Sequence, residues 1–193
     1  VIAGAGSGKT SALTNRIAYL IEERGVSPWS ILAVTFTNKA ANEMKGRILG
    51  LLSNSNLSPT DNYDINYKSN IPTVGTFHSI CVRILRKNIH HLNLENSFAI
   101  YDTADQQIVV KQVMEDLNID PKKTNPKAVL SHISNAKNQL IGPSDYQQFA
   151  NDHFTQKVAD IYPRYQNILQ KNSALDFDDI IMYTVKLFQN FPD

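Results

Sequence analysis

The sequence lacks long hydrophobic runs and has almost no cysteine. No apolar run in its 193 residues reaches the roughly 18 residues that a membrane-spanning helix needs, which excludes a membrane span and a membrane partner. The one cysteine, Cys81, has no second cysteine with which to form an internal disulfide, and the N-terminus lacks the basic and apolar pattern of a signal peptide. Both observations favour a cytoplasmic protein.

Acidic residues are missing from one stretch of the chain. Residues 65–94 contain none, although the formal net charge of the whole sequence is only +1. The same stretch contains four basic residues, which are Lys68, Arg83, Arg86 and Lys87. A basic patch is typical of proteins that bind nucleic acid, and an ordinary solvated helix surface explains the same charges equally well.

Glycine is concentrated at the start of the chain, in "VIAGAGSGKTSALTNRIAYL". Residues 3–10 have the spacing of a phosphate-binding loop, with Ala3 where the pattern usually has glycine. Glycines let the backbone curl so that successive N–H groups face phosphate oxygens, and the following helix adds its positive end. A dinucleotide fingerprint is excluded because the glycines are spaced G-x-G-x-G.

The loop therefore predicts that the chain binds a nucleoside triphosphate. Lys9 is expected to contact the β- and γ-phosphates and Thr10 to ligate Mg²⁺, which are the catalytic roles of these residue types in such loops. The residues predicted to surround the phosphates are Ala3, Gly4, Ala5, Gly6, Ser7, Gly8, Lys9 and Thr10.

Strands and helices alternate up to about residue 90. Residues 1–3 and "ILAVTF" (31–36) favour strands, the second one buried on both faces as in a parallel sheet. Helices are expected at 10–25, ending at Gly25, and at 38–52. After a polar loop at 53–70, "IPTVG" (71–75) predicts another strand and 76–92 a helix capped by Thr76. The pattern predicts an α/β fold with a parallel sheet.

Beyond residue 103 the pattern is helical, and no strand is expected. "FAIYD" (98–102) predicts an extended segment, followed by a helix with a capping box from Thr103 to Gln106. Asp102 is interpreted as part of that helix start and not as an acid that holds Mg²⁺. The aspartates of "LDFDD", which are Asp176, Asp178 and Asp179, are interpreted as helix-start charges because no strand is expected before them. The acid that would hold Mg²⁺ either lies beyond Asp193, or the chain binds nucleotide without cleaving it.

Four stretches together resemble one family: "AGAGSGKT", "AVTFTNKAANEMKGRI", "VGTFHSICVRILR" and "SALDFDDIIM". They are similar to superfamily 1 DNA helicases of the UvrD, Rep and PcrA type, the PcrA branch most of all. The resemblance covers almost the whole chain apart from the loop at 53–70. It implies a P-loop NTPase (RecA-like) motor domain with an inserted all-helical subdomain. Residues 1–90 would form part of the motor domain (1A), residues 91–175 the helical subdomain (1B), and residues 176–193 a helix that returns toward the motor domain.

The resemblance also implies contacts with single-stranded DNA. "TFTNKAA" would supply Phe36, Thr37 and Asn38, and "TFHS" would supply Thr76, Phe77 and His78. Aromatic rings can stack on bases of any sequence, and the polar groups can contact the backbone. Without the resemblance, both phenylalanines would be interpreted as core residues and both threonines as helix caps, although a cap and a phosphate contact are compatible.

The function implied by the resemblance is that of the N-terminal, ATP-binding part of an ATP-dependent DNA helicase. Such an enzyme uses ATP and Mg²⁺, translocates 3′ to 5′ on single-stranded DNA and unwinds duplex DNA in repair or replication. The expected partners are single-stranded and duplex DNA, the remaining helicase domains and repair or replication-initiator proteins.

The start at Val1, inside a predicted strand, suggests a piece of a longer chain that would be inactive alone. The adenine-contacting segment, the Asp-Glu pair that binds Mg²⁺ and the arginine fingers would then lie elsewhere in the parent chain. A nucleotide-binding regulatory module that never contacts DNA, and a helicase subunit of an AddA or RecB type helicase-nuclease, remain as alternatives.

Overall fold

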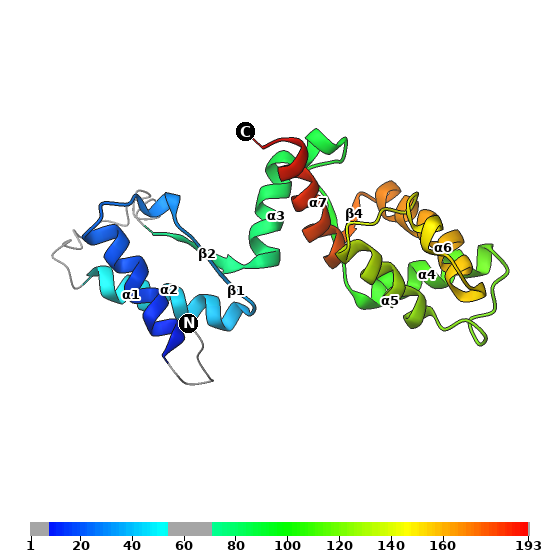
Figure 1. Cartoon of the computed structure of the whole chain (residues 1–193), viewed down its shortest axis with the longest axis horizontal. Coiled ribbons are helices and arrows are strands. Elements are labelled where there is room, and N and C mark those ends of the chain that lie inside the picture. The colour runs from blue at the N-terminus through cyan, green and yellow to red at the C-terminus, as the bar shows by residue number, and fades with distance from the viewer. Residues whose placement is uncertain (1–7, 54–70, 193) are drawn as a thin grey trace. The chain divides into compact units, whose positions relative to one another are not determined.

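The computed structural model describes residues 8–53 and 71–192 (Figure 1). Proximity of Cα atoms divides the chain into two compact units, Val1–Ile80 (unit 1) and Cys81–Asp193 (unit 2). The domain boundaries at residues 90 and 175 remain predictions. The strand predicted at residues 1–3, most of the phosphate loop and the loop at 54–70 lie outside the described residues.

Unit 1 alternates helices and strands as predicted. Its elements are α1 (Lys9–Glu22), the short 3₁₀ helix η1 (Pro28–Ser30), β1 (Leu32–Thr35), α2 (Asn38–Ser53) and β2 (Thr73–Thr76). β1 and β2 pair in parallel, with Leu32 opposite Thr73 and Thr35 opposite Thr76. The core joins both helices to β1 and consists of Ile17, Ala18, Ala33, Met44, Ile48 and Leu52. The predicted parallel sheet is thus confirmed for this pair of strands.

Two details of unit 1 bear on the sequence predictions. α1 ends at Glu22, three residues before the end expected at Gly25. Gly25 still closes the turn that follows the helix, because it adopts a φ of +60° and the N–H of Val26 donates to the carbonyl of Leu20 at 2.9 Å. The prediction that β1 is buried on both faces is wrong for Leu32, which is 56% exposed. Alternate residues of a strand face opposite sides, and only the side of Ala33 packs against α1 and α2.

Unit 2 is mainly helical. α3 (Phe77–Asn88) begins in unit 1 and leads to η3 (Ile89–Leu92), β3 (Ala99–Tyr101), α4 (Thr103–Asp116), α5 (Pro126–Asn138), η4 (Tyr146–Phe149), α6 (His153–Lys171), β4 (Ala174–Asp176) and α7 (Phe177–Asn190). The helices α4, α5 and α6 share one core, in which Val110, Met114, Val129, Ile161 and Tyr162 are fully buried. We refer to these three helices as the bundle. Among the described residues, no helix is long and apolar enough to cross a bilayer.

The structure corrects two predictions in unit 2. β4 is a strand where none was expected, and it pairs in parallel with β3, with Ala99 opposite Ala174 and Tyr101 opposite Asp176. Three residues that are all buried show no alternation from which a strand could have been predicted. The capping box of α4 is also shifted by one residue. Asp102 is the N-cap, and its Oδ1 accepts hydrogen bonds from the N–H groups of Ala104 (2.7 Å) and Asp105 (3.0 Å).

Candidate functional site

The described part of the phosphate loop is the entry into α1. Gly8 is the N-cap of α1 and has a φ of +77°, a left-handed conformation that glycine adopts without strain. A Cβ built at Gly8 would meet no other atom within 4 Å. The glycine is therefore required by the backbone conformation and not by lack of space. The residues Ala3, Gly4, Ala5, Gly6 and Ser7 lie outside the described residues.

The first turn of α1 has the chemistry of an anion site. Gly8 offers no side chain to cap the helix, the first turn contains no acidic residue, and Lys9 lies there with an exposed side chain. The N–H groups at the start of a helix and the helix dipole both attract negative charge. Thr10 is half-buried beside Lys9. The residues present therefore fit a phosphate group, and the roles of Lys9 and Thr10 toward phosphate and Mg²⁺ stay predictions.

The two segments predicted to contact DNA follow adjacent strands. Because Thr35 pairs with Thr76 in a parallel sheet, the residues after β1 and after β2 emerge at the same edge. Phe36 is 91% exposed and Phe77 is 45% exposed, and their ring centroids lie 5.6 Å apart at an interplanar angle of 46°. The alternative interpretation of both rings as core residues is wrong. Asn38 and His78 are exposed nearby in sequence.

Both threonines cap the helix that follows them. The hydroxyl oxygen of Thr37 accepts from the N–H of Ala40 at 3.2 Å, and that of Thr76 accepts from the N–H of Ser79 at 3.2 Å. The helix-cap interpretation is therefore confirmed. It leaves the DNA prediction open, because a capping hydroxyl accepts one hydrogen bond and can still donate its own hydrogen.

One hollow brings the two sets of predicted residues together. It has a volume of about 390 Å³ and lies between α1, β1 and α2, with Leu13, Val34 and Met44 as apolar lining. Lys9 and Thr10 line it from α1, and Phe36 and Thr37 line it from the end of β1. The other predicted DNA contacts, which are Asn38, Thr76, Phe77 and His78, do not line this hollow.

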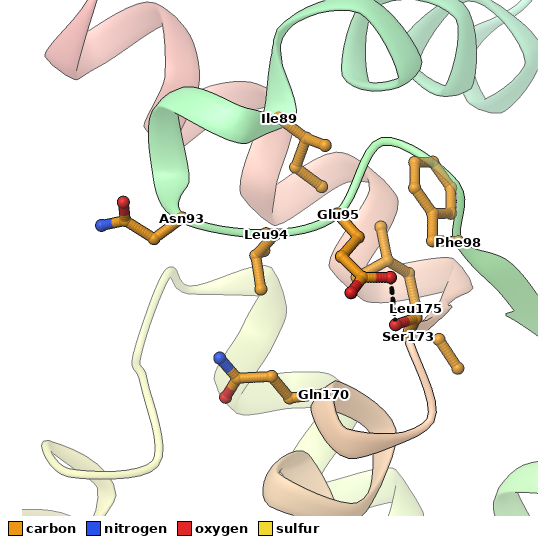
Figure 2. Close-up of a pocket in the computed structure, with 9 residues that line it drawn as sticks. Ile89, Asn93, Leu94, Glu95, Phe98, Gln170, Ser173 and Leu175 are labelled. Carbon is orange, nitrogen blue, oxygen red and sulfur yellow. Dashed lines mark hydrogen bonds between the residues drawn. The ribbon is translucent and has the colours of Figure 1, made fainter.

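A second hollow, of about 220 Å³, lies within unit 2 (Figure 2). Its lining is apolar at Ile89, Leu94 and Phe98, and Figure 2 shows the carboxylate of Glu95 turned toward Ser173. The hydroxyl of Ser173 donates to Glu95 Oε2 at 2.7 Å, which ties the loop after η3 to the segment before β4. No residue predicted from the sequence to be functional lines it.

A buried ionic cluster was missed by the sequence analysis. Lys137 Nζ of α5 lies 2.6 Å from Asp176 Oδ2 and 2.8 Å from Asp179 Oδ1, and all three side chains are at most 2% exposed. Asp176 and Asp179 form the capping box of α7, so their interpretation as helix-start charges is confirmed. The signal that could have revealed their partner is the position of Lys137, which shares the inward face of α5 with Val129, Ile133 and Ala136. A lysine in such a stripe needs a buried acid.

The cluster perturbs the acid–base chemistry around it. Burial raises the pKa of Tyr165, and the charge of Asp176, to which the hydroxyl of Tyr165 donates at 2.8 Å, raises it further. Burial also raises the pKa of Asp179 to about 6, while Lys137 acts in the opposite sense. Perturbed groups of this kind mark either a functional site or a structural network. Lys137, Tyr165, Asp176 and Asp179 are all buried, so these groups are not exposed to a ligand at the surface.

Comparison with known proteins identifies the family. The model of the UvrD/REP helicase N-terminal domain matches residues 1–193. The chain belongs to this family, as the resemblance predicted, and the parallel strands agree with the predicted P-loop NTPase fold.

Individual relatives carry a more particular name. The chain is 49% identical over all of its 193 residues to the protein named ATP-dependent DNA helicase PcrA from Bacillus subtilis (strain 168) and covers 24% of that protein. It is 47% identical to the protein of the same name from Staphylococcus epidermidis (strain ATCC 12228) and 46% identical to that from Staphylococcus aureus (strain NCTC 8325), covering 25% of each. The chain thus spans about a quarter of the length of these relatives.

Proposed function

We propose that the chain is the ATP-binding N-terminal part of a DNA helicase that translocates 3′ to 5′ along single-stranded DNA and unwinds duplex DNA. Family membership and the printed names of the relatives support the proposal. The observation that carries it is the hollow at the carboxyl edge of β1, which Lys9 and Thr10 share with Phe36 and Thr37. A motor needs its nucleotide and its DNA strand at connected places, and this hollow connects the residues predicted for both.

The nucleotide would bind at the start of α1. Gly8 and the first N–H groups of α1 would surround phosphate oxygens, Lys9 would neutralise the β- and γ-phosphates, and Thr10 would hold Mg²⁺. When bound, Mg²⁺–ATP supplies the phosphoryl group whose transfer to water releases the free energy for movement. The catalytic contribution of this chain's own residues is positioning and charge stabilisation.

The single strand would run along the edge formed by the residues after β1 and after β2. Two exposed rings 5.6 Å apart, Phe36 and Phe77, offer faces on which bases can stack without regard to sequence. Thr37 and Thr76 stand at helix N-termini, where a backbone phosphate is attracted, and Asn38 and His78 add polar groups beside them. Work on chromosomal DNA would place the protein in the cytoplasm, together with the other helicase domains and repair or replication proteins.

The proposal is tested by ATP hydrolysis in the full-length protein that contains this chain. We expect the ATPase rate to rise on addition of single-stranded DNA, and strand displacement to need a 3′ single-stranded tail. A rate that does not respond to single-stranded DNA would contradict the proposal and favour a nucleotide-binding regulatory module. Displacement from 5′ tails alone would contradict the proposed direction.

A further inference from the structure

The cluster around Lys137 has more negative than positive charge. We call it the hub, and its members are Lys137 of α5, Tyr165 and Gln166 of α6, Asp176 at the end of β4, and Asp179 and Tyr183 of α7. One ammonium faces two carboxylates, and the other members are uncharged, so the hub has a formal charge of −1. In the part of the chain that the structure describes, Lys137 is the one cation within ion-pair distance of either carboxylate. An uncompensated charge is costly where water is excluded.

The hydrogen bonds of the two aspartates are not equivalent. Asp176 accepts three short ones, from Lys137 at 2.6 Å, from the hydroxyl of Tyr165 at 2.8 Å and from the N–H of Asp179 at 2.8 Å. Asp179 is 2.8 Å from Lys137, but its other bonds are longer, from Gln166 at 3.1 Å to each oxygen and from the N–H of Asp176 at 3.2 Å. Asp179 is therefore the carboxylate whose charge is less well compensated.

Gln166 can serve either protonation state of Asp179. Its Nε2 donates to both carboxylate oxygens and to the hydroxyl of Tyr183 at 3.3 Å, while its buried Oε1 has no hydrogen-bond partner among the described residues. Rotation of the amide by half a turn puts Oε1 where Nε2 now lies. The carbonyl could then accept from a protonated Asp179 and from the Tyr183 hydroxyl, whose hydrogen can turn either way.

The surroundings favour proton uptake at Asp179. Burial raises its pKa to about 6, Lys137 lowers the pKa, and the neighbouring Asp176 raises it again. Burial raises the pKa of Tyr162, and the charges of Asp179, Asp176 and Asp178 raise it further, so Tyr162 and Asp178 also interact electrostatically with this cluster. The N–H groups at the start of α7 oppose protonation, since they favour the carboxylate.

We propose that the hub is a proton-linked joint in which Asp179 takes up one proton from solvent, so that the start of α7 is held more firmly on α5 and α6 when the hub is neutral. The carboxylate becomes a carboxylic acid, Lys137 and Asp176 remain as a neutral ion pair, and no other bond forms or breaks. Because the folded chain binds this proton more tightly than the unfolded chain, the stabilisation is complete at low pH and disappears as the pH rises through about 6.

The proton itself can be observed by infrared spectroscopy of the intact protein. Between pH 7.5 and pH 5 we expect a carbonyl stretching band of a protonated buried carboxyl to appear in the wild type and to be missing in Asp179→Asn. The matched control Asp116→Asn, which changes an exposed carboxylate of α4, should keep the band. Identical spectra of the wild type and Asp179→Asn over this range would overturn the proposal.

Two further measurements separate the joint from a merely structural cluster. Asp179→Asn mimics the neutral hub at every pH, so the wild type should gain stability relative to this variant as the pH falls from 7.5 to 5. A difference that is constant, or that moves in the opposite direction, contradicts the proposal. Gln166→Leu should keep the infrared band but move it to higher frequency, because the acid loses its acceptor. An unmoved band would remove Gln166 from the mechanism.

Discussion

The first turn of α1 and the first turn of α7 satisfy their backbone N–H groups in opposite ways. At α7 two aspartates form a capping box, and a lysine from another helix neutralises part of their charge, all at 2% exposure or less. At α1 the cap is a glycine, the first turn has no acid, and an exposed lysine stands where the helix dipole is least favourable for a cation. α7 contains its own counter-charges, whereas the chemistry of α1 suits an anion that comes from outside.

The difference shows that the start of α1 lacks the side-chain cap with which helices commonly begin. α4 and α6 also start with aspartate caps, Asp102 and Asp152, each within a capping box. α2, α3 and α5 are capped by the side chains of Thr37, Thr76 and Asn125. Among the described α-helices, α1 differs in having no side-chain cap, and it follows the phosphate-loop pattern. Local choices that oppose intrinsic stability are expected at functional sites, so the contrast supports the proposed nucleotide site independently of any motif.

The largest effect is expected when the buried ion pairs at the start of α7 are broken. Lys137→Met leaves two buried carboxylates without their cation, and losing one partner of a buried ion pair costs about 3–5 kcal/mol. Urea denaturation should show this loss of unfolding free energy. Lys127→Met, which changes an exposed lysine of the same helix, should be nearly neutral, and equal stability of the two variants would argue against the ionic role of Lys137.

Removing Lys9 at the start of α1 should lower activity and leave stability almost unchanged. Lys9→Ala is expected to lower the ATPase rate of the full-length protein by about two to three orders of magnitude, the usual cost of losing a charge-stabilising donor. Its thermal unfolding midpoint should stay close to that of the wild type, because the side chain is exposed. Lys45→Ala, an exposed lysine of α2, is the control. Wild-type turnover in Lys9→Ala would refute the nucleotide assignment.

Removing the exposed rings after β1 and β2 should have an intermediate effect, on the binding of single-stranded DNA. Stacking on an aromatic side chain contributes about 1–3 kcal/mol per base, so Phe36→Ala and Phe77→Ala should each weaken single-stranded DNA binding by that amount in fluorescence anisotropy. Phe149→Ala removes a ring that is 51% exposed in η4 and serves as the matched control. If all three variants bind alike, the predicted DNA track is wrong.

The smallest effect is expected at the start of α4, where the capping aspartate is exposed to solvent. Asp102→Ala removes the cap of α4 and should cost about 1 kcal/mol of unfolding free energy. Thr103→Ala, one residue along, should cost much less, because the side chain of Asp102 makes the capping bonds. Equal losses in the two variants would restore the cap position predicted from the sequence.

Local patterns were predictable from the sequence, and long-range pairs were not. The glycine spacing predicted the entry into α1, and the alternation of apolar segments predicted β1, α2 and β2, because each signal lies within a few neighbouring residues. Lys137 is 39 residues from Asp176, and no local pattern connects them. β4 was missed for a similar reason, since the helices of the bundle separate it in the sequence from its partner β3. The side-by-side placement of Phe36 and Phe77 depends on strand register and therefore needed the structure.

The pairing of β3 with β4 has a consequence for how this part of the chain can vary. The chain enters the bundle after Tyr101, at the end of β3, and returns from it at Ala174, where β4 begins beside β3 with Ala174 opposite Ala99. Neighbouring strands lie about 4.8 Å apart, so the pairing of β3 with β4 holds the two ends of the bundle close together. Helices of the bundle can lengthen, shorten or be exchanged without moving β3 and β4, provided that a partner for Asp176 is kept.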